Sequence, residues 1–205
     1  MRHRFAFFAV LAALALATAA CAGDPPSGSG QGAAAPASTA AASRPTTAPP
    51  ATHPRTVRHA PKGVVPAGER EPAPELRVTA FDGQHVHLAG WKGQPVVVNF
   101  FESWCVVCRA EQDYLTEVAR RFGDQVQFVG VSNYDTVSEG RKFQRQFEIP
   151  YPLANDSSGH TWAVWRVPYQ PVTVVVDRQG RIAWRFDGGL EPGQLDLVLE
   201  YVVGV

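Results

Sequence analysis

The sequence predicts an α/β domain in which helices flank a central mixed β-sheet. Short apolar runs typical of buried strands alternate with segments whose apolar residues recur every three or four positions, as in amphipathic helices. This alternation is usual where strands pair in parallel through crossover helices. Two further pairs of short strand-like runs, each joined by turn residues, predict antiparallel hairpins near the start and the end of the domain. The sheet should therefore contain both kinds of pairing.

The first twenty residues have the layout of an export signal. Arg2, His3 and Arg4 precede an apolar run from Phe5 to Ala20. A transmembrane anchor is the alternative, although this run is at the short end of what spans a bilayer. We therefore expect residues 1–20 to be a signal peptide that directs the chain out of the cytoplasm.

Cys21 follows this segment directly. Its surroundings resemble the lipobox of bacterial lipoproteins, in which the cysteine becomes the lipidated first residue. Thr18 stands where leucine is usual, and the A-T-A run at 17–19 would also serve as an ordinary cleavage site. The resemblance implies a lipid anchor at the outer face of a bacterial membrane, with secretion as the alternative.

The composition changes sharply along the chain. Residues 21–71 are dominated by Ala, Pro, Ser, Thr and Gly, so they cannot bury a core and are expected to form a disordered tether, either a spacer or a passive leader. Residues 72–205 should form one domain. The 19 basic and 19 acidic side chains leave no net charge, so nucleic acid is not an expected partner.

The domain is expected to open with a β-hairpin. The runs 76–81 and 84–88 alternate in hydrophobicity and are joined by Asp82-Gly83, a dipeptide that favours a tight turn. His85 and His87 should share one strand face. Two such histidines could ligate a metal, but without Cys or carboxylate partners in sequence reach we expect a plain exposed face and no metal site.

The central feature of the domain is the stretch PVVVNFFESWCVVCRAE, residues 95–111. Its unbroken apolar run predicts a strand buried on both faces. From Cys108 onward the apolar residues recur at helical spacing until Gly123, so a helix follows. Cys105 should therefore lie at a helix N-terminus, where free N–H groups stabilise a thiolate.

The remaining segments continue the alternation, and one aromatic pair among them, Trp162 and Trp165, is expected to pack in the core. Pro150 and Pro152 should break the chain, and Pro192 should lie just inside the last helix. In order we expect strand 126–131, helix 136–147 with Phe143 and Phe147 on one face, short helix 159–166, strand 171–177, strand 181–186 and helix 192–203.

Cys105 and Cys108 are the only cysteine pair once Cys21 is assigned to the anchor. One pair is too few for a disulfide scaffold or a four-cysteine zinc site. In a C-x-x-C pair at a strand-to-helix junction, the first sulfur can attack and the second can resolve the mixed disulfide. The spacing therefore indicates thiol redox chemistry.

This order of elements resembles the thioredoxin fold, and within it the membrane-tethered thiol-disulfide oxidoreductases of the TlpA/ResA/DsbE group. The resemblance is carried by VVVNFFESWCVVCRAE at 96–111, by VPYQPVTVVVDRQG at 167–180 and by the helix-bearing insertion between 131 and 150. It covers about residues 75–205. It implies a thioredoxin-like domain with an N-terminal β-hairpin and an inserted helix.

The resemblance also implies roles for individual residues. Cys105 would be the nucleophile and Cys108 the resolving thiol, with Trp104 shielding the sulfurs. The Gln170-Pro171 bond would be cis and would lie against the dithiol. Trp104, Gln170 and Pro171 are therefore the expected substrate-binding residues.

Glu111 matches an acidic position of the ResA-like members, although it could also be a first-turn helix glutamate favoured by the dipole. Thioredoxin itself has a buried aspartate where this chain has Asn99, so a proton acceptor for Cys108 must be Glu111, water or nothing. Val106-Val107 lacks the proline that many relatives carry, which frees one backbone N–H. Arg109 could offset the charge of Glu111 if it folded back.

The function that the resemblance implies is exchange of disulfides with protein substrates outside the cytoplasm, by a monomer with a membrane redox partner and no cofactor. Apolar Val106-Val107 and the charge of Glu111 oppose thiolate formation, so the balance leans towards a reductant, as in ResA-like relatives that act in cytochrome c maturation. A disulfide-forming oxidant of the DsbE type is the alternative.

Other readings of the cysteine motif are less favoured. The sequence V-C-R-A-E at 107–111 faintly echoes the V-C-P-T-E motif of peroxiredoxins, but that motif needs a hydroxyl where Cys105 stands. A metallochaperone of the Sco type would need wider cysteine spacing and a later histidine, for which His160 is the only candidate. A c-type haem site would need histidine where Arg109 stands. A redox-silent binding lipoprotein would use the pair as a permanent staple, although so short a loop gives little stability.

Overall fold

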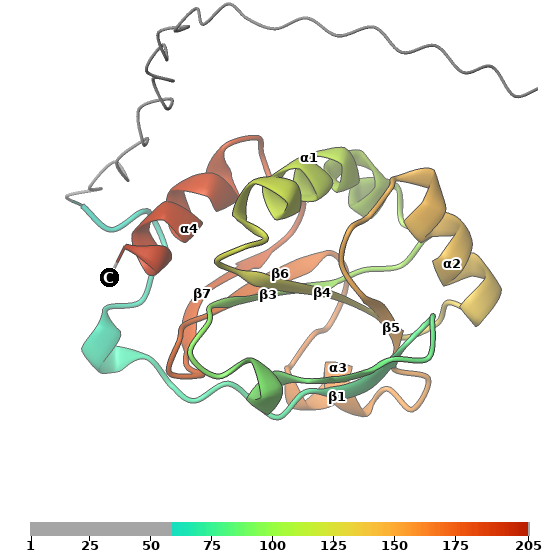
Figure 1. The fold of residues 1–205 in the computed structure, drawn as a ribbon, viewed down its shortest axis with the longest axis horizontal. Coiled ribbons are helices and arrows are strands. Elements are labelled where there is room, and N and C mark those ends of the chain that lie inside the picture. The colour runs from blue at the N-terminus through green and yellow to red at the C-terminus, as the bar shows by residue number, and fades with distance from the viewer. Residues whose placement is uncertain (1–58, 205) are drawn as a thin grey trace, which may run out of the picture. The chain divides into compact units, whose positions relative to one another are not determined.

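The computed structural model describes residues 59–204, which form a seven-stranded mixed sheet with helices on both faces (Figure 1). The expected α/β class is confirmed. The strand order is β2-β1-β5-β4-β3-β6-β7. The strands are β1 Arg77–Ala80, β2 His85–His87, β3 Val96–Phe100, β4 Gln127–Ser132, β5 Leu153–Asn155, β6 Val172–Val176 and β7 Ile182–Asp187. The helices are α1 Val106–Phe122, α2 Val137–Gln146, α3 His160–Val164 and α4 Gln194–Val203, with 3-10 turns η1 Ala67–Glu69 and η2 Leu88–Trp91.

Strand β3 lies near the centre of the sheet and sets the position of the site. It pairs in parallel with β4 and antiparallel with β6, and all five of its side chains are buried, as expected for a strand covered on both faces. Phe100 pairs with Val131 of β4 and with Val172 of β6. The end of β3, the end of β4 and the start of β6 therefore meet at one edge.

The two faces of the sheet bury separate apolar cores. One core lies under α1, α2 and α4, and the other lies under α3 and η2 (Figure 1). In the second core Phe100 meets Trp162 edge-to-face at 5.9 Å and Trp165 at 5.6 Å between ring centroids. Both tryptophans are buried, so their expected packing role is confirmed.

Helix α2 forms where the sequence expects it. The side chains of Thr136 and Glu139 make a reciprocal capping box at its start. Phe143 stacks on Phe101 at 5.1 Å and contacts Phe147 at 4.8 Å between ring centroids, so the shared apolar face is confirmed.

Strand β5 follows the predicted break around Pro150 and Pro152, where the sequence analysis expected no strand. All three of its residues pair in parallel with β4, and Ala154 and Asn155 pair antiparallel with β1. This strand joins the N-terminal hairpin to the main sheet. It was missed because three residues are too few to show a hydrophobic period.

The start of α4 also differs from the prediction. Pro192 lies before the helix, whose N-cap is Gly193 with φ of 86°. This left-handed conformation is open to glycine and costly for other residues, so glycine rather than proline defines the start.

Residues 61–71 of the predicted tether pack against the domain. Val65 N–H donates to the Ala183 carbonyl and Ile182 N–H donates to the Glu71 carbonyl, both at 2.8 Å. Arg70 is buried against Asp177 with an N–O distance of 3.1 Å. The folded region therefore begins earlier than residue 72, because this segment covers the exposed edge of β7.

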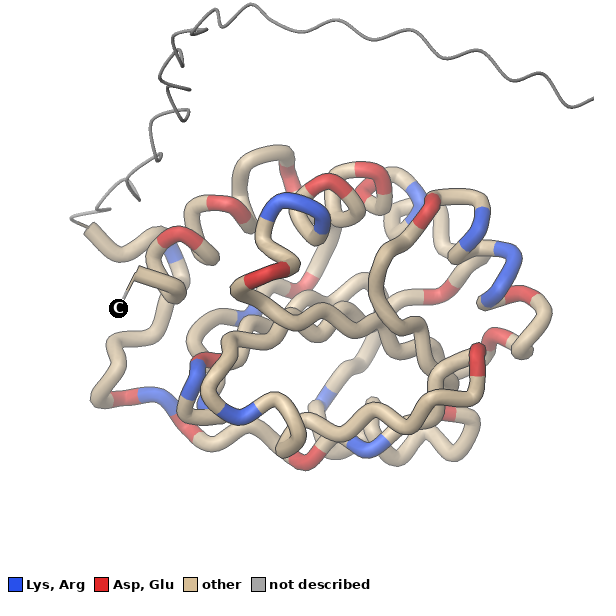
Figure 2. Tube along the Cα trace, viewed as in Figure 1, with Lys and Arg blue, Asp and Glu red and all other residues tan. Residues whose placement is uncertain are grey.

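Charge does not mark one face of the described domain. Basic and acidic positions are interspersed in Figure 2, and both occur on α1 and on α2. Within residues 59–204 no helix is long and apolar enough to cross a membrane. The predicted signal peptide and Cys21 lie outside the described residues.

Candidate active site

The dithiol lies at the junction between the end of β3 and the start of α1. Cys105 is the N-cap of α1 and Cys108 lies in its first turn. The two form a disulfide with a Cα–Cα distance of 5.3 Å. The Cys108 N–H donates to Cys105 Sγ at 3.2 Å. This N–H of the first helical turn, which has no partner within the helix, would also stabilise a thiolate on Cys105 after reduction.

The two cysteine residues differ in exposure. Cys105 is 8% exposed and Cys108 is 1% exposed. Cys105 is thus less open than the sequence suggested, but it remains the more accessible of the pair. An incoming thiolate or disulfide would meet Cys105 first.

The residues for which the resemblance implied substrate binding lie at the end of the sheet from which the dithiol loop emerges. The Gln170-Pro171 bond is cis, as expected, and directly precedes β6. Because Val172 pairs with Phe100, this bond lies at the edge from which the dithiol loop emerges. Trp104 is 59% exposed, so it presents an open aromatic surface next to Cys105 rather than a closed cover.

Glu111 is buried on α1, one turn beyond Cys108. Asn99 Nδ2 donates to its Oε1 at 3.2 Å and the Leu190 N–H donates to its Oε2 at 2.6 Å. Burial raises the pKa of Glu111 to about 7, against these two hydrogen bonds, which lower it. The first helical turn contains no acidic residue, so the alternative of a first-turn dipole glutamate is wrong.

Arg109 does not offset the charge of Glu111, a role that the sequence analysis had left open. Its Nη1 donates to the Ser103 carbonyl at 3.0 Å, and its guanidinium lies 5.2 Å from the ring centroid of Phe147. The cation therefore braces the dithiol loop against α2 instead of folding back on Glu111.

Two buried carboxylates that the sequence analysis did not single out tie the dithiol loop to the loop after β4. Glu102, which is fully buried, accepts from Asn133 N–H at 2.8 Å and from Tyr134 N–H at 3.1 Å. Asp135 accepts in return from Ser103 N–H at 2.9 Å and from Ser103 Oγ at 2.7 Å. Burial raises the pKa of Glu102 above its usual range. Each loop thus binds the backbone of the other.

A signal for this pair was present in the sequence. Glu102 follows a buried strand directly, and S-N-Y-D at 132–135 follows the next one. Polar residues after neighbouring parallel strands meet at one sheet edge.

Comparison with known proteins places the chain in a family. A profile described as the AhpC/TSA family matches residues 70–185. The chain belongs to the AhpC/TSA family. It is 25% identical over 131 residues to a thiol-disulfide oxidoreductase ResA of Bacillus thuringiensis, covering 63% of this chain and 76% of that protein. It is also 32% identical over 106 residues to the soluble secreted antigen MPT53 of Mycobacterium tuberculosis, covering 52% and 61%.

Solved structures of disulfide oxidoreductases and their homologues are also similar to this chain. A DsbF homologue from Corynebacterium diphtheriae is 30% identical with a TM-score of 0.60, covering 69% of this chain and 96% of that one. A secreted Mycobacterium tuberculosis disulfide oxidoreductase homologous to DsbE is 26% identical with a TM-score of 0.55, covering 63% and 96%. The predicted TlpA/ResA/DsbE-like resemblance and the predicted enzyme class, a thiol-disulfide oxidoreductase, are therefore confirmed.

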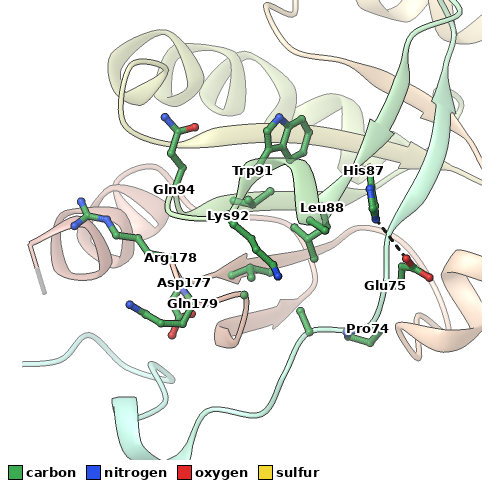
Figure 3. Close-up of a pocket in the computed structure, with 15 residues that line it drawn as sticks. Pro74, Glu75, His87, Leu88, Trp91, Lys92, Gln94, Asp177, Arg178 and Gln179 are labelled. Atoms are coloured by element: carbon green, nitrogen blue, oxygen red, sulfur yellow. Dashed lines mark hydrogen bonds and ion pairs between the residues drawn. The ribbon is translucent and has the colours of Figure 1, made fainter.

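A separate hollow of about 280 Å³ lies where β3 begins and β6 ends, at the opposite end of these strands from the dithiol (Figure 3). Its lining includes Val96, the first residue of β3, and Val176, the last residue of β6. His87 and Glu75 meet at its rim, 3.3 Å apart. The cysteines follow the other end of β3, so this hollow does not belong to the dithiol site.

Proposed function

We propose that this chain reduces disulfides in protein substrates outside the cytoplasm. The observation that carries the proposal is the unequal placement of the two sulfurs, with Cys105 at the accessible helix start and Cys108 buried one turn in. A helix N-terminus stabilises the thiolate that attacks, and a buried neighbour can resolve the product.

The proposed reaction begins with the reduced dithiol. The Cys105 thiolate attacks one sulfur of a substrate disulfide, and the other substrate sulfur leaves as a thiolate that takes a proton. Cys108 then loses its proton, attacks Cys105 Sγ and releases the second substrate thiol. The substrate gains two electrons and two protons, and the enzyme is left with the Cys105–Cys108 disulfide. A membrane redox partner would restore the dithiol.

Opposing electrostatic effects set the direction of electron flow. The Cys108 N–H and the helix start stabilise the reduced form through the Cys105 thiolate. Apolar Val106-Val107 and any negative charge on Glu111 oppose this. Because the pKa of Glu111 is about 7, that opposing charge is only partly present at neutral pH. A stabilised thiolate raises the redox potential and an opposed one lowers it, so a partly neutral Glu111 weakens the lean towards a reductant without reversing it. The lean rests on apolar Val106-Val107, on the charge that Glu111 does carry and on the likeness to ResA, which makes apocytochrome c a candidate substrate.

A redox titration against glutathione or dithiothreitol tests the direction. A potential well below about −220 mV is expected for a reductant. A potential near about −120 mV would instead identify a disulfide-forming oxidant of the DsbE type. A pair that stays oxidised throughout and exchanges with no thiol would mean a redox-silent staple.

The proposal includes attachment at the outer face of a bacterial membrane through Cys21, as a monomer. An extracytoplasmic location is in keeping with the relatives, one of which is described as a secreted antigen. Peroxidase chemistry is less well supported, because Cys105 occupies the position where the peroxiredoxin motif needs a hydroxyl and is bonded to Cys108.

A further inference from the structure

Tyr134 combines an exposed side chain with a fixed backbone. Its side chain is 71% exposed, whereas its N–H is bound by the fully buried carboxylate of Glu102. Large aromatic side chains left in solvent on an anchored backbone are typical of contact residues, because they offer apolar area at low entropic cost.

The topology places Tyr134 beside the dithiol. Strands β3 and β4 are parallel, and Phe100 pairs with Val131. The loop with Trp104 and Cys105 and the loop with Tyr134 therefore leave the sheet at the same edge, as neighbours. Two exposed aromatic residues, Trp104 and Tyr134, therefore stand on adjacent loops.

Glu102 controls how these two loops sit. It belongs to the dithiol loop, yet its side chain accepts from Ser132 Oγ at 2.8 Å and from two backbone N–H groups of the other loop. Asp135 N–H donates to the same Ser132 Oγ at 3.0 Å. Loss of the Glu102 carboxylate would leave these donors without an acceptor and would free the Tyr134 loop to move.

We propose that Tyr134 is a second substrate-contacting residue and that Glu102 is the positioning residue that holds it beside Trp104. The inference rests on the proposed function and names its substrate class. The ligand is an extended polypeptide segment that flanks the reacting disulfide. A small disulfide would reach Cys105 without touching the Tyr134 loop, so it would not sense either residue.

The first test compares two substrates in steady-state reduction, with insulin as the protein disulfide and glutathione disulfide as the small one. Tyr134→Ala should raise KM for insulin about five-fold and leave kcat/KM for glutathione disulfide within about two-fold of the wild type. The matched control is Leu197→Ala, because Leu197 is 52% exposed on α4, a different element. Leu197→Ala should leave KM for insulin and kcat/KM for glutathione disulfide at the wild-type values.

The second test concerns Glu102. Glu102→Ala should raise KM for insulin as Tyr134→Ala does. Glu102→Gln should keep KM for insulin close to the wild-type value, because the amide keeps an oxygen acceptor for the backbone N–H groups and can donate to Ser132 Oγ. The double variant Tyr134→Ala with Glu102→Ala should be no worse for insulin than either single variant.

The outcomes separate the inference from the function on which it rests. If the wild type reduces neither insulin nor glutathione disulfide, the proposed function fails. If the wild type reduces both and Tyr134→Ala matches Leu197→Ala, the docking role of Tyr134 is overturned. Equal losses for both substrates in Tyr134→Ala would also overturn it, since a general disturbance of the dithiol would then explain the effect.

Discussion

Asn99 donates a hydrogen bond from Nδ2 to Oε1 of Glu111 at 3.2 Å, and so links the central strand to the helix that carries Cys108. The same amide donates to Thr173 Oγ1 at 3.0 Å on β6. Asn99 cannot take a proton, but it orients a carboxyl group whose pKa burial raises to about 7. A group that changes charge near neutral pH thus lies one helical turn from the resolving cysteine.

The first prediction concerns the stability of Glu111→Gln. The folded pKa of Glu111 is about 7 and its ordinary value is 4.5, so ionisation in the folded state costs roughly 3 kcal/mol. This cost is absent below pH 4.5 and fully present above pH 7. The free energy of unfolding of the wild type should therefore fall relative to the glutamine variant as pH rises through this window.

Urea unfolding of both oxidised proteins at about pH 4.5 and 8.5 measures the effect. The difference between the two proteins isolates Glu111, because other titrating groups are shared. A difference that does not change with pH would show that Glu111 ionises as an ordinary exposed carboxylate does.

The second prediction assigns the roles of the cysteines. Cys105→Ser should abolish disulfide exchange, whereas Cys108→Ser should accumulate mixed disulfides with substrates, because nothing then resolves them. Non-reducing electrophoresis after incubation with insulin reports both. In the reduced wild type, Cys105 should be alkylated by iodoacetamide faster than Cys108, and equal rates for the two thiols would count against the assignment.

The sequence predicted most of the elements that position this site. The buried run of β3, the helical period of α1 and the turn residues of both hairpins each reflect local interactions, so the pattern was sufficient. The cis bond at Gln170-Pro171 came from the family resemblance and not from a local pattern.

What escaped prediction depends on contacts between distant segments. Strand β5 exists because β4 and β1 lie on either side of it. The bonds between Glu102 and the Tyr134 loop cross about thirty residues of chain, and the Leu190 N–H that bonds to the buried carboxylate of Glu111 comes from the far end of the domain. A single sequence does not show such pairings.

The third prediction concerns the anchor, which stays a sequence-based proposal. Cys21→Ala should move the protein from the membrane fraction to the medium, or leave it uncleaved, since the lipid would have no attachment site. Cell fractionation with immunodetection measures this. If the variant fractionates like the wild type, Cys21 does not anchor the chain.

The last prediction tests the packing that holds α2 against the sheet. Gly140 lies in α2, and a Cβ built on it would come within 2.1 Å of the Phe81 ring, which is buried in the core. Alanine is the better helix former by about 1 kcal/mol, but overpacking a core costs about 1–3 kcal/mol. Because Phe81 has little room to give way, Gly140→Ala should lower the free energy of unfolding by about 1–2 kcal/mol.

Gly90→Ala is the matched control for this substitution. Gly90 lies in η2, and a Cβ there would meet no atom within 4 Å. Urea unfolding should place this variant within about 0.5 kcal/mol of the wild type. If Gly140→Ala were as stable as Gly90→Ala, the Phe81 ring would have to rotate freely, and α2 would not be held by that contact. In that case the capping box of Thr136 and Glu139 and the stack of Phe143 on Phe101 would be left to fix the helix beside the Tyr134 loop.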